Sequence, residues 1–328
     1  MNECRRGTQH AVIKLAVDTV DSPAVLNFAR FFIAALLCAP QLPSSREPLT
    51  PLRCAGEDKV SGDSLQQRRE SAFATWRAGL ELGIWMFLGY AFQAVGLETT
   101  SASRSCFLLY LNVKLVPIFS SIFLDREIPF PTWVSAATAL LGTALVANDG
   151  SPPVIGDAWS FAAAVASAIF ILRLEALAPK YDPRELNATS LASVAVLCAC
   201  WFFFGALLHT AGSDVEPEIN QLLAASSHVF AETKDLLITS GPAVLYLSVV
   251  TTALCNWLQT IGQTRVGAEQ AALIYALDPV WGALFARILC GDELGAQGIT
   301  GGALIVAAAL GSQLINTPKP GFSGEAER

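Results

Sequence analysis

The sequence predicts an all-α, polytopic membrane protein of ten transmembrane helices, arranged as two inverted five-helix repeats with a truncated first helix. Three observations predict this fold class: an apolar composition, a series of apolar blocks of membrane-spanning length, and an internal repeat. Of the 328 residues, 53% are hydrophobic and 15% are charged, whereas roughly 25% are charged in a typical soluble protein. So few charges cannot cover the surface of a water-soluble fold of this length.

Nine apolar windows each approach or reach the length that a helix needs to cross a bilayer, about 20 residues. Their apolar residues are continuous rather than alternating, which favours helices over the strands of a membrane barrel. The windows are 24–42, 78–97, 101–124, 129–147, 156–177, 188–208, 241–262, 267–290 and 296–315. Glycines at helical spacing within them, such as Gly79 and Gly83, are interpreted as positions where helices pack closely.

A tenth apolar stretch, Gly7 to Val17, is too short to cross the membrane. At ~1.5 Å a residue it covers only about half of the ~30 Å hydrocarbon core. We interpret it as the end of a first helix whose start is missing from the chain. The predicted first repeat is therefore 7–147 and the second is 156–315, followed by a disordered tail at 316–328.

Two hydrophilic connections differ in charge, which predicts the orientation of the protein. Residues 43–77 carry six basic residues among Pro, Ser and acidic residues, which indicates a mobile loop, whereas residues 211–239 are acidic. With ten spans and a cytosolic N-terminus, fourteen Lys and Arg residues face the cytosol and three face the opposite side. The positive-inside rule thus predicts that the 43–77 loop and both termini are cytosolic.

The internal repeat appears when the chain is shifted by 166 residues. Eight identities then coincide within 45 aligned positions, among them Gln93 with Gln259, and an acidic turn separates two spans in each copy. Because each unit contains an odd number of spans, the second copy is inverted in the membrane. Inverted repeats are typical of secondary transporters, whose sites lie near the membrane midplane.

Several other classes of partner and chemistry are not predicted. The net charge is −7 and no basic patch is present, so nucleic acid is not an expected partner. The eight cysteines form no C-x-x-C pair and the three histidines no ligand-spaced pair, so we expect no metal, disulfide framework or cofactor. No phosphate-binding G-x-x-x-x-G-K-[ST] loop occurs, so ATP hydrolysis is not expected.

Short motifs along the chain resemble the EamA-domain branch of the drug/metabolite transporter superfamily. They lie at Thr8–Lys14, Ser22–Arg30, Gly96–Ala102, Val116–Phe119, Asp278–Trp281, Gly291–Leu294 and Gly301–Ile305. The resemblance covers about residues 8–315 and implies a ten-helix carrier with helices 1 and 2 beside a central cavity. It implies alternating access for a small polar metabolite, such as an amino acid, a drug or a related solute, in a lipid bilayer, and no enzymatic activity.

Ionisable side chains inside spans are candidates for the substrate site, because each costs at least ~2.5–3.5 kcal/mol at the bilayer centre. Lys14 and Arg30, with the polar Asn27 nearby, fall on the helices that the resemblance places beside the cavity. Their charges would attract an anionic or zwitterionic solute. The alternative is that they reach an interface or anchor a helix end.

A second group of candidates is related by the repeat. Asn112 and Lys114 are deep in the fourth predicted span, and Asn112 aligns with Asp278 in the ninth. Asp278 precedes Pro279, which weakens local helix hydrogen bonding and would expose carbonyl groups to a cavity. A carboxylate at that depth is a candidate for exchanging a coupling proton. The alternative is a structural ion pair between Asp278 and Lys114.

Neutral polar and aromatic side chains complete the candidate site: Gln93, Asn256, Trp257, Gln259 and Tyr275. They would supply hydrogen bonds and an aromatic wall, although amides also commonly join membrane helices to one another. Five other tryptophans are nearer span ends and are assigned to an interfacial belt: Trp76, Trp85, Trp133, Trp159 and Trp201.

Two other classes of protein stay open at this point. One is a membrane-embedded enzyme with Asp278 and Lys114 as its acid and base. The other is a membrane protein that does not transport, because its first helix is incomplete.

Overall fold

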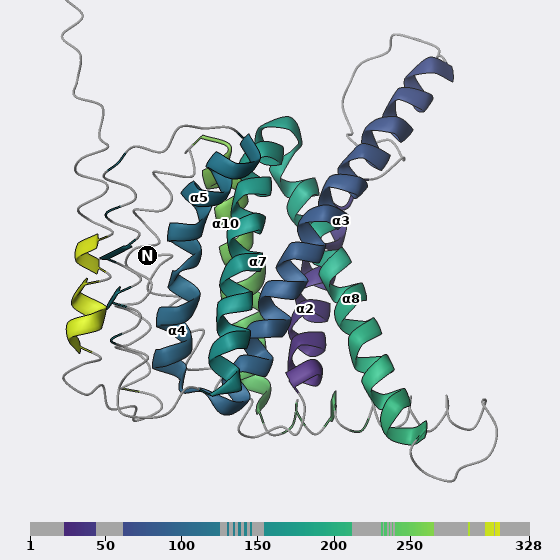
Figure 1. Cartoon of the computed structure of the whole chain (residues 1–328). Coiled ribbons are helices and arrows are strands. Elements are labelled where there is room, and N and C mark those ends of the chain that lie inside the picture. Colours follow the sequence, from purple (N-terminus) through teal and green to yellow (C-terminus); the bar gives the residue numbers. More distant parts are fainter. Residues whose placement is uncertain are drawn as a thin grey trace, which may run out of the picture.

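The computed structural model describes residues 23–43, 62–124, 154–211 and 240–265 continuously, with isolated residues or short groups within 130–145, 231–238 and 288–308 (Figure 1). Every element in the continuous segments is a helix. They are α2 (Pro23–Cys38), η1 (Ala39–Gln41), α3 (Gly62–Thr99), α4 (Ala102–Tyr110), α5 (Asn112–Leu124), α7 (Ile155–Leu177), η2 (Ala178–Lys180), α8 (Pro183–Ala211), the π-helical segment η3 (Tyr246–Leu254) and α10 (Cys255–Gln263).

Five stretches of the described helices are long and apolar enough to cross a membrane: Ala24–Gln41, Arg69–Thr99, Ile155–Lys180, Pro183–Phe204 and Ser240–Gln263. They coincide with five of the predicted windows, which confirms the all-helical, multi-pass character of this part of the chain. The stretch at 7–17 and the tail at 316–328 lie outside the described residues, and the windows 129–147, 267–290 and 296–315 lie largely outside them.

The helix α3 begins much earlier than the sequence predicts. The expected mobile loop extended to residue 77, but α3 starts at Gly62, so the prediction is wrong for residues 62–77. This segment is rich in Gln, Arg and Glu, which are good helix formers, and Gln66 bonds to Glu70 one turn later at 3.3 Å. At ~1.5 Å a residue the whole helix is nearly twice as long as the ~30 Å hydrocarbon core, and its first turns project beyond the bundle (Figure 1).

The fourth predicted span is not one helix, because it breaks into α4 and α5 at Leu111. The backbone N–H of Leu111 turns back to the carbonyl of Leu108 at 3.1 Å, and α5 restarts at Asn112. Within α5, Pro117 has no N–H to donate to the carbonyl four residues earlier, which weakens the first turns of this helix. The two short helices stack end to end beside α7 (Figure 1).

Glycines allow α3 to pack closely against both α7 and α8. A Cβ atom at Gly79 would lie 2.1 Å from the hydroxyl of Thr189 on α8, and one at Gly83 would lie 2.6 Å from the Cβ of Ser193. Further along α3, a Cβ atom at Gly96 would lie 3.0 Å from the carbonyl oxygen of Gly156 on α7. The predicted packing role of Gly79 and Gly83 is therefore confirmed.

Two ion pairs join α7 to α4 and α3, one toward each end of α7. At one end, Arg104 Nη2 lies 3.1 Å from Asp157 Oδ2, and both side chains are largely buried. The same carboxylate accepts a hydrogen bond from the Thr100 hydroxyl at 2.5 Å and caps α7 through the N–H of Val154. At the other end, the guanidinium of Arg173 pairs with Glu81, and both side chains are exposed.

These two pairs are expected to contribute unequally to stability. Asp157→Asn leaves the buried Arg104 without its counter-charge and should lower the free energy of unfolding by about 3 kcal/mol. Glu81→Gln leaves Arg173 unpaired near the end of the span Ile155–Lys180, where its long side chain is expected to reach the membrane surface, so the cost should be smaller, less than about 1 kcal/mol. Thermal unfolding of the two purified variants in one detergent measures the difference, and equal melting temperatures would contradict it.

Candidate functional site

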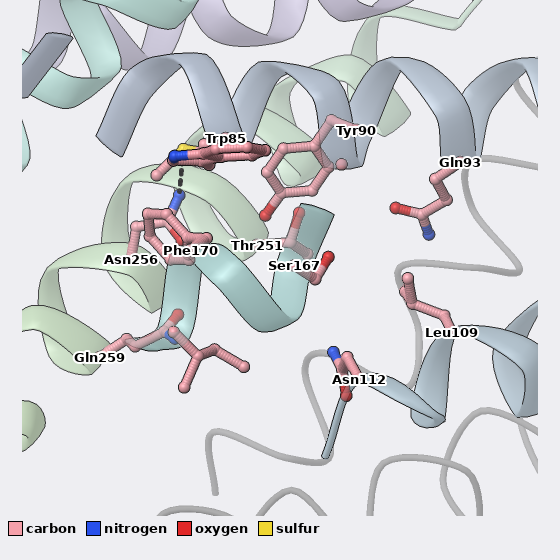
Figure 2. A pocket seen from close by; sticks show the side chains of 13 residues that line it. Trp85, Tyr90, Gln93, Leu109, Asn112, Ser167, Phe170, Thr251, Asn256 and Gln259 are labelled. Carbon is pink, nitrogen blue, oxygen red and sulfur yellow. Dashed lines mark hydrogen bonds between the residues drawn. The ribbon is translucent and has the colours of Figure 1, made fainter. Parts of the chain in front are cut away.

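A cavity of about 120 Å³ lies between α3, the α4–α5 break, α7 and the η3–α10 helix (Figure 2). Its lining contains hydrogen-bonding groups and apolar side chains in similar measure. The lining residues are Trp85, Met86, Gly89, Tyr90, Gln93, Leu109, Asn112, Ser167, Phe170, Ile171, Thr251, Asn256 and Gln259. A partly polar cavity between helices is a usual position for a small-molecule site.

The longest wall comes from α3, whose lining residues recur at the spacing of one helical face. Three of its lining residues, Trp85, Gly89 and Gln93, recur at four-residue intervals. The side chains of Trp85 and Gln93 therefore point the same way, with Gly89 on the same face between them. On the opposite side, Asn112 begins α5 immediately after the break in the helix. The interruption at Leu111 thus lies between two lining residues, Leu109 and the polar Asn112.

The internal repeat relates two of the cavity walls. The three lining residues of η3 and α10 are Thr251, Asn256 and Gln259, and each is 166 residues from a lining residue of α3. The pairs are Trp85 with Thr251, Tyr90 with Asn256, and Gln93 with Gln259. Equivalent positions of the two copies therefore face one space.

The segment η3 is a π-helix, which is rare and frequently found at functional sites. Its sequence places two valines and two threonines in succession, and β-branched residues are stiff in an α-helix. The hydroxyl of Thr251 donates to the carbonyl of Leu247 at 2.8 Å, and that of Thr252 donates to the same carbonyl, five residues earlier, at 2.7 Å. Both hydroxyl oxygens are thereby left as acceptors for another donor.

That donor is Arg30 of α2, whose side chain is fully buried behind the cavity wall. Its Nε donates to Thr252 Oγ1 at 2.5 Å and its Nη2 to Thr251 Oγ1 at 3.3 Å. The Cζ atom lies 4.6 Å from the centre of the Tyr90 ring, a cation–π contact. Arg30 does not line the cavity, but two of the residues that it contacts, Tyr90 and Thr251, do.

The structure separates the predicted site residues into two groups. Gln93, Asn112, Asn256 and Gln259 line the cavity (Figure 2). The other predicted residues of the described segments, which do not line it, are Asn27, Arg30, Lys114 and Trp257.

Those four residues have different surroundings. The side-chain amide of Asn27 donates to the backbone carbonyl of Tyr90 at 3.3 Å and so joins α2 to α3. Lys114 is buried on α5, and Trp257 is half-buried on α10. Arg30 neither reaches an interface nor forms an ion pair with a described carboxylate.

Three further predicted residues, Lys14, Tyr275 and Asp278, lie outside the described residues. Asn112, the residue with which Asp278 aligns in the repeat, lines the cavity.

Sequence reasoning missed several lining residues, and it placed Trp85 in the wrong environment. Trp85 was assigned to the interfacial belt, but it lines the cavity beside Met86 and Tyr90. Its assignment rested on its distance from the span end, and the early start of α3 makes that distance a poor guide to depth. The 166-residue shift from Thr251 is a signal that would have found it.

The apolar helices define a multi-pass membrane protein with a partly polar cavity between its helices. Residues 60–148 and 154–313 each match the EamA-like transporter family. These two matches cover most of the sequence, and the chain belongs to the EamA-like transporter family, with two EamA domains.

Individual proteins agree with this assignment. The chain is 26% identical over 309 residues to a protein of Archaeoglobus fulgidus described as an uncharacterized transporter, covering 93% of this chain and 80% of that protein. A solved protein crystal structure with 17% sequence identity has a TM-score of 0.59, covering 96% of this chain and 94% of that chain. The latter likeness concerns the fold alone.

Proposed function

We propose that the protein is a secondary carrier that moves a small polar solute across a membrane by alternating access between its two EamA domains. One observation carries this proposal: the cavity is lined by both domains. Of the described lining residues, seven, from Trp85 to Asn112, belong to the first domain, and six, from Ser167 to Gln259, belong to the second. A site at such a boundary changes its access when one domain rocks against the other.

The size and chemistry of the cavity support a small solute. Its volume is similar to the ~150 Å³ of an engineered protein cavity that binds benzene. The amides of Gln93, Asn112 and Asn256 offer both donors and acceptors, and Trp85 and Phe170 offer flat apolar surfaces. A solute of about the size of a short amino acid or carboxylic acid would fit these walls.

The proposal includes ten spans in two inverted repeats, with both termini in the cytosol. The coincidence of repeat-related residues at one cavity supports the inversion, and the fourteen-to-three distribution of Lys and Arg supports the orientation. Impermeant labels should therefore reach cysteines introduced into 43–61 from the cytosolic side and those in 212–230 from the other side. Labelling of both regions from one side would contradict this topology.

The same cavity supports the function of a membrane-embedded enzyme less well. The described lining residues offer amides, hydroxyls and aromatic rings. None of these residues is acidic or basic, so they supply no acid–base pair for proton transfer. The predicted base Lys114 is on α5 but does not line the cavity.

Counterflow in proteoliposomes tests the proposed function. Vesicles are loaded with unlabelled L-alanine or isobutyrate and diluted into a trace of the labelled compound. A carrier should give transient, saturable accumulation that depends on the internal solute. Uptake that is unaffected by internal solute would indicate a channel, and the absence of uptake of both compounds would favour a protein that does not transport.

Coupling to protons is assigned to Asp278 as part of this proposal, because its repeat partner Asn112 lines the cavity. Asp278→Asn should abolish accumulation driven by a pH gradient and leave solute exchange measurable, since exchange requires the site but no net proton movement. Asn112→Asp, at the equivalent position, serves as the comparison. Unchanged pH-driven accumulation in Asp278→Asn would show that coupling does not use this residue.

A further inference from the structure

The buried guanidinium of Arg30 lacks a counter-charge in the described part of the chain. It donates hydrogen bonds to the neutral hydroxyls of Thr251 and Thr252, and its Nη1 atom is buried without a hydrogen-bond partner. No Asp or Glu of the described segments lies within ion-pair distance of it. A buried cation without a paired anion is costly, so a negative charge is expected to be supplied to this region from elsewhere.

The cavity is separated from this charge by a single layer of side chains. Thr251 accepts a hydrogen bond from Arg30 Nη2 and also lines the cavity, and the Tyr90 ring both lines the cavity and contacts the guanidinium. None of the described lining residues is charged. Because a protein interior screens charge much less than water does, the field of Arg30 reaches a solute in the cavity.

The orientation of the hydroxyl groups holds this charge in place. Since the Thr251 and Thr252 protons are directed to the Leu247 carbonyl, their oxygens remain bound to the guanidinium, which fixes its position behind the wall. The amides of Asn256 and Gln259, one to two turns along the same helix, also lie at this wall, and the Asn256 amide has a second N–H besides the one that bonds to Met86 Sδ at 3.8 Å. The apolar surfaces of Trp85 and Phe170 also line the cavity and would contact the uncharged part of the solute.

The geometry points to a solute that carries a carboxylate group, selected by Arg30 acting through Tyr90 and Thr251, with organic cations rejected. Arg30 is a positioning residue in this arrangement, because it does not touch the solute itself. This inference rests on the proposed function: it names the chemical class of the solute at the same cavity.

Matched small molecules test the inference on the unmodified protein. The first set is isobutyrate, isobutyramide and isobutylammonium, which share one carbon skeleton and differ in charge. The second set is L-alanine and L-alaninamide. Ligand-induced thermal stabilisation of the detergent-solubilised protein gives the affinity of each. Each carboxylate that binds should do so about 10-fold or more tightly than its amide, and isobutylammonium should bind weakest of its series.

Variants at position 30 test whether Arg30 causes the preference for a carboxylate over an amide. Arg30→Met removes the charge and should reduce the carboxylate-to-amide ratio to about one, whereas Arg30→Lys retains the charge and should retain a preference. If Arg30→Met does not fold, the ratios of the unmodified protein and of Arg30→Lys still decide the question. Equal affinities for acid and amide, or tighter binding of the cation, would overturn the inference.

The outcomes also separate this inference from the proposed function. Equal binding of acid and amide together with counterflow would contradict the charge selection and leave the carrier intact. Charge-selective binding without counterflow would contradict the carrier and support the selection. An absence of both binding and counterflow for all five probes would contradict both.

Discussion

Replacing Gly156 by alanine is expected to destabilise the protein by about 1–3 kcal/mol, although alanine is normally the better helix former. The new Cβ atom would lie 2.4 Å from the carbonyl oxygen of Gly96 and 2.4 Å from the hydroxyl of Thr99. The first of these is backbone, so relief requires α3 and α7 to move apart. That movement would loosen the helix pair that carries most of the cavity wall.

Gly262 provides the matched control for this prediction. It is also helical, but a Cβ atom added there would meet nothing within 4 Å. Gly262→Ala should therefore leave the melting temperature unchanged or raise it slightly, because only the helix preference of alanine acts. A Gly156→Ala protein as stable as Gly262→Ala would show that α3 and α7 are not in this close contact.

Filling the cavity with Leu109→Trp is expected to lower counterflow about 10-fold to 100-fold. Leu109 lines the cavity from the end of α4, and an indole would occupy much of the 120 Å³. Overpacking costs of about 1–3 kcal/mol then oppose every solute that enters, and each 1.4 kcal/mol is a factor of ten in affinity. The loss should appear as weaker binding in the thermal-shift measurement as well as slower exchange.

Ile122→Trp is the control, because this side chain is on the neighbouring helix α5 and is 65% exposed. The same indole at that position points away from the bundle and should leave counterflow near the unmodified rate. If both variants transport normally, the solute does not pass through this cavity. If both lose transport, the effect comes from the aromatic substitution rather than from occlusion.

Most of the described fold could be predicted from the sequence, because apolar length is enough to locate a membrane helix. The windows at 24–42, 78–97, 156–177, 188–208 and 241–262 correspond to helices in the structure. Apolar length does not show where helix ends or breaks occur. Residues 62–77 are polar and still helical, and the apolar run 101–124 is interrupted at Leu111 by hydrogen bonding that hydropathy does not detect.

The candidate site was predictable where polar amides interrupt apolar spans, as at Gln93, Asn112, Asn256 and Gln259. The aromatic and hydroxyl residues of the lining, among them Trp85, Phe170 and Thr251, were not, because such residues also occur in ordinary helix contacts and at membrane interfaces. Arg30 was singled out by its charge. Its position behind the wall depends on two threonines more than 200 residues away, which no local pattern reveals.

The central claim, that one cavity opens to each side of the membrane in turn, is tested most directly by a single cysteine at position 167. Ser167→Cys changes one atom of a lining residue and is introduced after the eight native cysteines are replaced. A charged, impermeant thiol reagent is applied to either side of sealed vesicles, with a cysteine at the exposed position of Val196 as the control. The account predicts reaction from both sides, slowed from both by a solute that undergoes counterflow, and little reaction at position 196. Reaction from one side only, whether or not solute is present, would contradict it.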